Sequence, residues 1–126
     1  MKHWLSPLLV LALLLGASLW NARCVSRSVE DWCAELEVSL ALAQAEDWDG
    51  ARDALDAVYS SWSARQTYFH IMLEHAELDA AEALFATAHS FAQAEEGAEF
   101  HANAAELLTQ LRLLREMEAL SVRNIL

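Results

Sequence analysis

The chain has 126 residues, with 19 acidic side chains against 8 basic ones and a formal net charge of −11. Because binding to nucleic-acid phosphates requires a basic surface, this charge argues against nucleic acid as a partner. The same sign of charge would repel the acidic part of the chain from an anionic lipid surface. Three glycines and one proline leave few helix-breaking residues, and alanine, leucine and glutamate are abundant, so the composition predicts an all-α protein.

An uncharged apolar segment covers residues 4–20 and is bounded by Trp4 and Trp20. As a helix rising ~1.5 Å per residue, it would reach ~25 Å, close to the ~30 Å hydrocarbon core of a bilayer. The two tryptophans lie at its ends, where amphipathic rings favour the headgroup level. We therefore expect residues 1–25 to form a transmembrane signal-anchor that holds the chain in the membrane bilayer. Residues 26–126 are long enough for one further helical domain.

A cleaved signal peptide is the alternative to an anchor, because Lys2 followed by an apolar run fits that pattern too. Cleavage requires small residues one and three positions before the cut. Cuts after Ala17 or Ala22 place a bulky residue in the upstream position, whereas a cut after Ser18 places Gly16 there. An uncleaved anchor is the preferred interpretation, and cleavage after Ser18 stays open.

The orientation depends on the charges that flank the apolar segment. Lys2 lies on one side and Arg23 and Arg27 lie on the other, so the basic residues nearly balance. A short N-terminal tail normally stays in the cytoplasm while the chain behind it is exported. We therefore expect a single-pass protein of the cell membrane, with residues 26–126 on the extracytoplasmic side.

Two features bear on a possible homodimer. Ala12 and Gly16 form a small-xxx-small pair that would let two anchor helices pack closely, although two small residues in a leucine-rich anchor need no such role. Cys24 and Cys33 would lie ~13 Å apart along one helix, too far to bridge each other. Two free thiols are expected, with a disulfide between two chains as the alternative.

Beyond the anchor, apolar residues recur at three- and four-residue spacing, which predicts helices at about residues 26–45, 51–75, 78–92 and 100–120. Turns are expected at 46–50, 76–77 and 95–97. The predicted fold is a four-helix bundle with a core that includes Leu55, Trp62, Phe85 and Leu111. The sequence Ala-Gln-Ala-Glu occurs at residues 43–46 and again at 92–95, so two stacked helical hairpins, like tetratricopeptide units, are the alternative.

Short motifs follow one another along the chain: E-D-W-D-G-A at 46–51, Trp62, H-A-E-L-D-A-A-E at 75–82 and N-I-L at 124–126. Together with the N-terminal anchor, this order resembles a family of small bacterial proteins called domain of unknown function 4363. The resemblance covers nearly the whole chain and implies an anchored helical protein, without an established activity, catalytic residue or ligand. The chain departs from the family pattern in being rich in alanine and poor in lysine, and in having Phe69 where a tryptophan is expected.

His75, Asp79 and Glu82 are the candidates for metal ligation, because on one helix they would form a single polar stripe. The turn expected near Ala76 would break that stripe. In the preferred interpretation, Glu77 and Asp79 cap the start of a helix while His75 bonds the last carbonyls of the preceding one. We therefore predict no metal and no cofactor. The sequence shows no arrangement typical of a catalytic site, so an enzyme is not expected.

The candidate interaction residues lie at a turn and at the C-terminus. Trp48 is expected to pack a hairpin corner, with stacking on a ligand as the alternative. The apolar tail, with Val122, Ile125 and Leu126 beside the polar Asn124, is expected to dock onto the bundle, with a partner's groove as the alternative.

Two functions are compatible with these features. The first is a membrane-anchored helical interaction module that binds or modulates another envelope or membrane protein without catalysis. The second is an extracytoplasmic ligand or metal sensor that uses residues 75–82.

Overall fold

The computed structural model describes residues 2–73 and 75–125, with the backbone alone for residues 2, 3, 22, 25, 72 and 121–125. It contains five helices, α1 (Lys2–Gln44), α2 (Trp48–Ala64), α3 (Gln66–Met72), α4 (His75–Gln93) and α5 (Gly97–Ile125). The predicted all-α fold is confirmed. Leu126 of the C-terminal tail lies outside the described residues.

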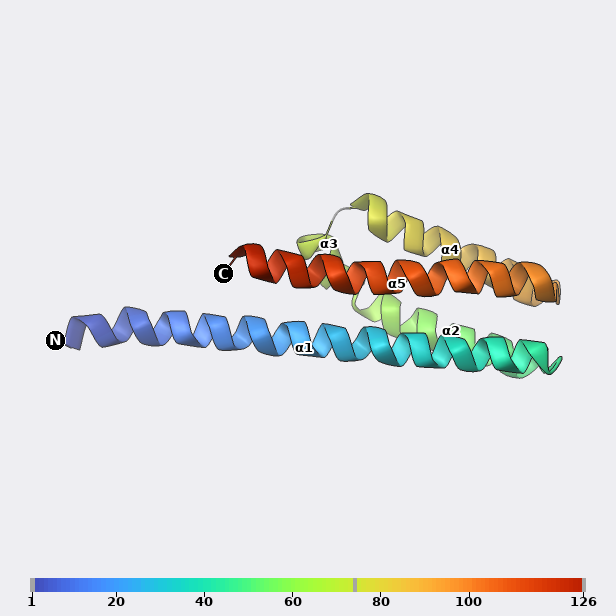
Figure 1. The fold of residues 1–126 in the computed structure, drawn as a ribbon, viewed down its shortest axis with the longest axis horizontal. Helices are drawn as coiled ribbons and strands as arrows, with labels where there is room; N and C mark the ends of the chain where they lie inside the picture. The colour runs from blue at the N-terminus through green and yellow to red at the C-terminus, as the bar shows by residue number, and fades with distance from the viewer. Residues whose placement is uncertain (1, 74, 126) are drawn as a thin grey trace.

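The long α1 helix runs without a break from the apolar segment into the bundle, as Figure 1 shows. Pro7 lies within its second turn, near the helix start, where a proline is best tolerated. By length and composition alone, this helix is long and apolar enough near its N-terminus to cross a membrane. The large side chains of residues 4–20 are exposed, from Trp4 at 76% to Trp20 at 72%, so the bundle does not cover this segment.

The four long helices form a ring in which α1 packs on α2 and α5, while α4 packs on α5 and α2. Chain direction alternates around the ring, as in an up-down-up-down four-helix bundle. Both hairpins of the alternative interpretation exist, namely α1–α2 and α4–α5, and they close on each other as one bundle. We call the end with the α1–α2 and α4–α5 turns the distal end, and the end nearest the apolar segment the basal end (Figure 1).

The four residues predicted for the core, Leu55, Trp62, Phe85 and Leu111, are each fully buried. The Trp62 and Phe85 rings lie 5.2 Å apart between centroids and join α2 to α4. Helical spacing therefore identified the inward face of each long helix correctly.

The single helix predicted over residues 51–75 is wrong, because α2 ends at Ala64 and α3 begins at Gln66. Serine and threonine residues around the break lower helix propensity. The change of direction lets Phe69 enter the core, where it is fully buried and packs against Trp32 at 6.1 Å between ring centroids. Burial of this ring offsets the cost of interrupting the helix.

Two further predicted boundaries are also wrong. The turn expected at residues 76–77 lies earlier in the chain, because Leu73 is extended and α4 begins at His75. The last helix continues past Leu120 to Ile125, so most of the expected tail is its final turn. The side chains of Val122, Asn124 and Ile125 are outside the described part, and their docking stays a prediction.

Both cysteines lie on α1, and no disulfide joins them within this chain. Cys33 is buried against the bundle, whereas Cys24 is half-buried nearer the apolar segment. Burial raises the pKa of the Cys33 thiol above its ordinary value, which makes this cysteine a poor nucleophile.

Candidate functional site

The two turns at the distal end have the same backbone geometry. In the first, the Asp47 amide donates to the Leu42 carbonyl at 2.9 Å, and the Glu46 amide donates to Ala43. In the second, the Glu96 amide donates to the Phe91 carbonyl at 3.0 Å, and the Glu95 amide donates to Ala92. Both are Schellman turns, and they fall on the repeated Ala-Gln-Ala-Glu sequence.

Each turn places a glutamate where glycine is the usual residue. Glu46 has φ 62° and Glu95 has φ 55°, both in the left-handed region. This conformation costs a residue with a Cβ atom roughly 1–2 kcal/mol. Backbone strain of this kind often marks a functional position, so Glu46 and Glu95 are candidate site residues.

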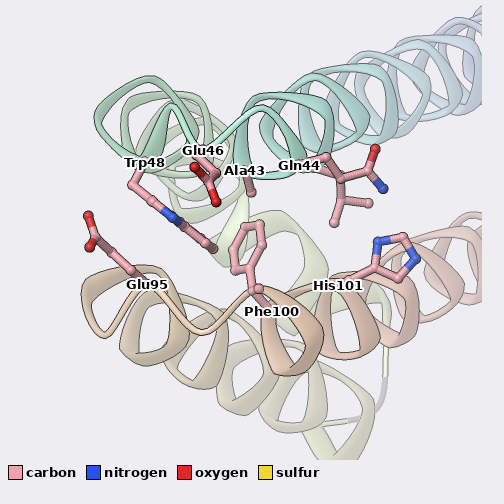
Figure 2. A pocket seen from close by; sticks show the side chains of 9 residues that line it. Ala43, Gln44, Glu46, Trp48, Glu95, Phe100 and His101 are labelled. Carbon is pink, nitrogen blue, oxygen red and sulfur yellow. The ribbon is translucent and has the colours of Figure 1, made fainter.

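Both strained glutamates line a pocket of about 280 Å³ between the turns, which we call the distal pocket. Its lining comes from the end of α1, both turns, the start of α2 and the start of α5, and consists of Leu40, Ala43, Gln44, Glu46, Trp48, Glu95, Gly97, Phe100 and His101. In the view of Figure 2, the carboxylates of Glu46 and Glu95 lie on either side of the Trp48 indole, and His101 lies beyond Phe100.

Trp48 packs the hairpin corner and also lines the distal pocket. Its ring meets Phe100 edge-on at 5.6 Å between centroids, and Phe100 is fully buried. Trp48 itself is half-buried, so part of the indole stays available to the pocket. An aromatic face bordered by carboxylates is a combination that attracts cations.

Arg52 joins the two distal turns. Its Nη1 donates to the Ala92 carbonyl at 3.0 Å, near the end of α4. Its Nη2 pairs with Asp49, and Glu95 lies 3.9 Å from Nη1. The guanidinium is therefore committed to the scaffold, while Glu46 has its side chain exposed beside the pocket. The arrangement suits a positively charged group on an apolar stem.

The residues suggested for metal binding lie on one helix but have different neighbours. His75, Asp79 and Glu82 all lie on α4, but His75 Nδ1 is 2.9 Å from Nδ1 of His70. Glu82 instead accepts a hydrogen bond from the Tyr59 hydroxyl at 2.7 Å, and Asp79 is exposed. Among the described residues, no group of three or more histidine, cysteine, aspartate or glutamate side chains is placed to hold a metal ion.

The remaining interaction candidates lie far from Trp48. Asn124 and Ile125 belong to the last turn of α5 at the basal end, opposite the distal pocket (Figure 1). Sequence analysis missed Glu46 and Glu95 as site residues. The repeated Ala-Gln-Ala-Glu sequence was the available signal, but only the packing of the two hairpins shows that the turns meet.

A family model described as domain of unknown function (DUF4363) matches residues 19–125. The chain belongs to this family. The match covers the bundle and the end of the apolar segment, and it confirms the resemblance seen in the motifs. No curated protein and no solved structure matches the chain.

Replacing Glu46 of this DUF4363 chain with glycine is expected to raise the free energy of unfolding by about 1 kcal/mol, because glycine adopts positive φ without steric cost. Glu46→Gln retains the backbone cost and is the control, with a stability within about 0.5 kcal/mol of the parent chain. Denaturant titration in one detergent compares the three proteins. A glycine variant no more stable than the glutamine variant would contradict the strain described for this turn.

Proposed function

We propose that this DUF4363 protein is a membrane-anchored interaction module without catalytic activity. Residues 4–20 cross the cell membrane, and the bundle lies on the extracytoplasmic side. The distal pocket binds a lysine or arginine side chain of another envelope or membrane protein. The observation that carries the proposal is the pocket itself, in which Glu46 and Glu95 border Trp48.

The chemistry of the pocket favours a cationic side chain over other ligands. The exposed Glu46 carboxylate can supply charge-assisted hydrogen bonds, which are stronger than those between neutral groups, and Glu95, which is already paired with Arg52 at 3.9 Å, adds negative charge nearby. The Trp48 indole adds a cation–π contact worth about 0.5–2 kcal/mol. The apolar contacts from Leu40 and Phe100 match the methylene stem that precedes the charge of a lysine or arginine.

The continuous α1 helix fixes the height of the pocket above the membrane. From Trp20 to Gln44, a helix rising ~1.5 Å per residue extends ~36 Å. At that height the pocket is beyond the lipid headgroups. This distance supports a protein partner that projects from the membrane, and it argues against a lipid as the ligand of the distal pocket.

The pocket chemistry is tested with the full-length protein in detergent, using Nα-acetyl-lysine methylamide as the probe. The probe is expected to shift the NMR resonance of the Trp48 indole N–H, while the neutral Nε-acetylated analogue should not. The shift should be lost in Glu46→Gln/Glu95→Gln. The control Asp53→Asn/Glu99→Gln removes two exposed charges from the same end outside the pocket, and it should keep the shift. Equal shifts with both probes would rule out recognition of the charge.

The orientation is tested in intact cells. Ser90 is exposed on α4, and Ser90→Cys in a chain with Cys24→Ser and Cys33→Ala provides one accessible thiol. A membrane-impermeant thiol reagent is expected to label it without lysis. Labelling only after lysis would place the bundle in the cytoplasm and contradict the proposed location. A mature N-terminus after Ser18 would instead show that the segment is removed.

The sensor alternative gains no support from the geometry. His75 and Glu82 face different partners in the described part of the chain, as set out above. An interaction module is therefore the function that the arrangement favours.

A further inference from the structure

The basal end is tied to the apolar segment by one hydrogen-bonded chain of side chains. Asn21, which follows Trp20 directly, donates from Nδ2 to the Tyr68 hydroxyl of α3 at 2.9 Å. The Tyr68 hydroxyl in turn donates to Glu118 Oε1 of α5 at 2.9 Å. These contacts hold α3 and the last turns of α5 at the level where the apolar segment ends.

Two large apolar side chains are exposed on α3 and α5, the two helices that this network joins to α1. Ile71 on α3 is 78% exposed, the highest value among the large hydrophobic side chains described. Leu120 on α5 is 55% exposed and lies two positions after Glu118. Removing such an aliphatic side chain from water is favourable, and the bundle buries neither of the two. Elsewhere on the bundle, Val38 and Leu113 are less exposed.

The part of α1 at this level, residues 21–29, carries basic side chains and no acidic ones. Every acidic residue of the sequence lies at or beyond Glu30. Arg23 and Arg27 are exposed on α1 before that point and, with Trp20 and Cys24, line a small pocket of about 60 Å³. Arginine beside tryptophan at the end of an apolar segment matches the phosphate layer of a bilayer.

We propose that the basal end rests in the headgroup layer of the membrane that α1 crosses. Ile71 and Leu120 insert among the upper acyl carbons, and Arg23 and Arg27 bind phospholipid phosphates. The occupant of this surface is the bilayer, because the surface continues directly from the apolar segment and because Arg23 and Arg27 supply charge complementary to phosphate. The inference rests on the proposed function only in requiring that residues 4–20 span the membrane.

Contact between the basal end and the headgroup layer would limit how the domain tilts and rotates. A domain attached through one helix would tilt and turn freely above the bilayer. Contacts on α1, α3 and α5 fix its axis, because three helices meet the headgroups instead of one. Figure 1 shows α3 and the end of α5 at the same end of the bundle, with α5 extending past α3 toward the N-terminal half of α1. The distal pocket is then held at one height and one angle.

The test uses the full-length chain in phosphatidylcholine and phosphatidylglycerol vesicles, with Cys24→Ser and Cys33→Ala as the background. A nitroxide is attached at Ile71→Cys, and its collision rates with oxygen and with a water-soluble nickel complex are measured. Val10→Cys in the apolar segment and Ser90→Cys near the distal end are the references. The label at position 71 is expected to favour oxygen, as at position 10, and to meet the nickel complex several-fold less often than at position 90.

Each outcome decides the inference. If the label at position 71 is as accessible to the nickel complex as the one at position 90, while the label at position 10 stays in lipid, the basal end does not contact the membrane. The proposal that residues 4–20 span the membrane would then still hold. A water-exposed label at position 10 would refute both the membrane-spanning segment and the membrane contact of the basal end. Spin–spin broadening at 71 that disappears on dilution with unlabelled chain identifies a second copy as the occupant and also overturns the proposal. With Arg23→Gln/Arg27→Gln, the label at 71 should become more accessible to nickel, and an unchanged rate would refute the phosphate contacts.

Discussion

Replacing Leu111 with alanine is expected to lower the free energy of unfolding by about 2–5 kcal/mol. Leu111 lies in the middle of α5 and is fully buried. The α5 helix packs against both α1 and α4, so the cavity would open where three helices meet. Neighbours held by two hairpins have little freedom to collapse into that space, which places the cost toward the upper part of the range.

Leu113→Ala is the matched control, because it makes the same chemical change two residues along the same helix. Leu113 is 38% exposed, so truncation loses less buried surface and leaves no closed cavity. Its cost should be clearly smaller than that of Leu111→Ala. Urea titration of the full-length chain in a mild detergent, followed by tryptophan fluorescence, compares the two. Similar costs would mean that α5 presents a different face to the core.

The sequence was sufficient to predict the long helices and their buried faces, because both depend on a local period. Leu55 and Phe85 were recognised as core residues from helical spacing alone. The break between α2 and α3 was not predictable in this way. It is set by the burial of Phe69 against Trp32, a contact between residues far apart in the chain.

The distal pocket escaped sequence analysis for a related reason. Glu46 and Glu95 were seen as parts of two turns, and both turns exist, although α2 begins at Trp48, inside the first turn expected at 46–50. Their role as a pair depends on the hairpins packing with both turns at one end, which no local pattern records. The burial of Glu118 was not predictable for a similar reason. Glutamate is usually exposed on a helix, yet this side chain is only 2% exposed.

Replacing Tyr68 with phenylalanine is expected to lower the free energy of unfolding by about 1–3 kcal/mol. The lost hydroxyl donates to Glu118 Oε1 and accepts from Asn21 Nδ2. Because the Glu118 side chain is buried, water cannot replace the missing donor without opening the packing around Glu118. The variant therefore leaves a buried polar atom short of a partner.

Tyr59→Phe is the control for this change. The Tyr59 hydroxyl also donates to a carboxylate oxygen, Glu82 Oε1, at 2.7 Å. Glu82 is half-buried, so water can take the place of the hydroxyl, and the loss should stay below about 1 kcal/mol. Equal losses in the two variants would show that the burial of Glu118 has no special energetic weight.

Alkaline titration provides a second readout of the Tyr68 contact. Burial, followed by the hydrogen bond to Glu118, raises the pKa of Tyr68 well above its ordinary value of 10.0. The folded state thus favours the neutral hydroxyl, and the stability that this contributes is fully present below the unfolded-state pKa and is lost as the pH rises through the folded-state pKa. Unfolding measured from neutral pH upward should show the gap between the parent chain and Tyr68→Phe narrowing above pH ~10. A gap that stayed constant as long as the bundle remained folded would mean that folding does not raise the pKa of the Tyr68 hydroxyl, and the hydrogen bonds that join Asn21, Tyr68 and Glu118 would then lack the energetic role assigned to them.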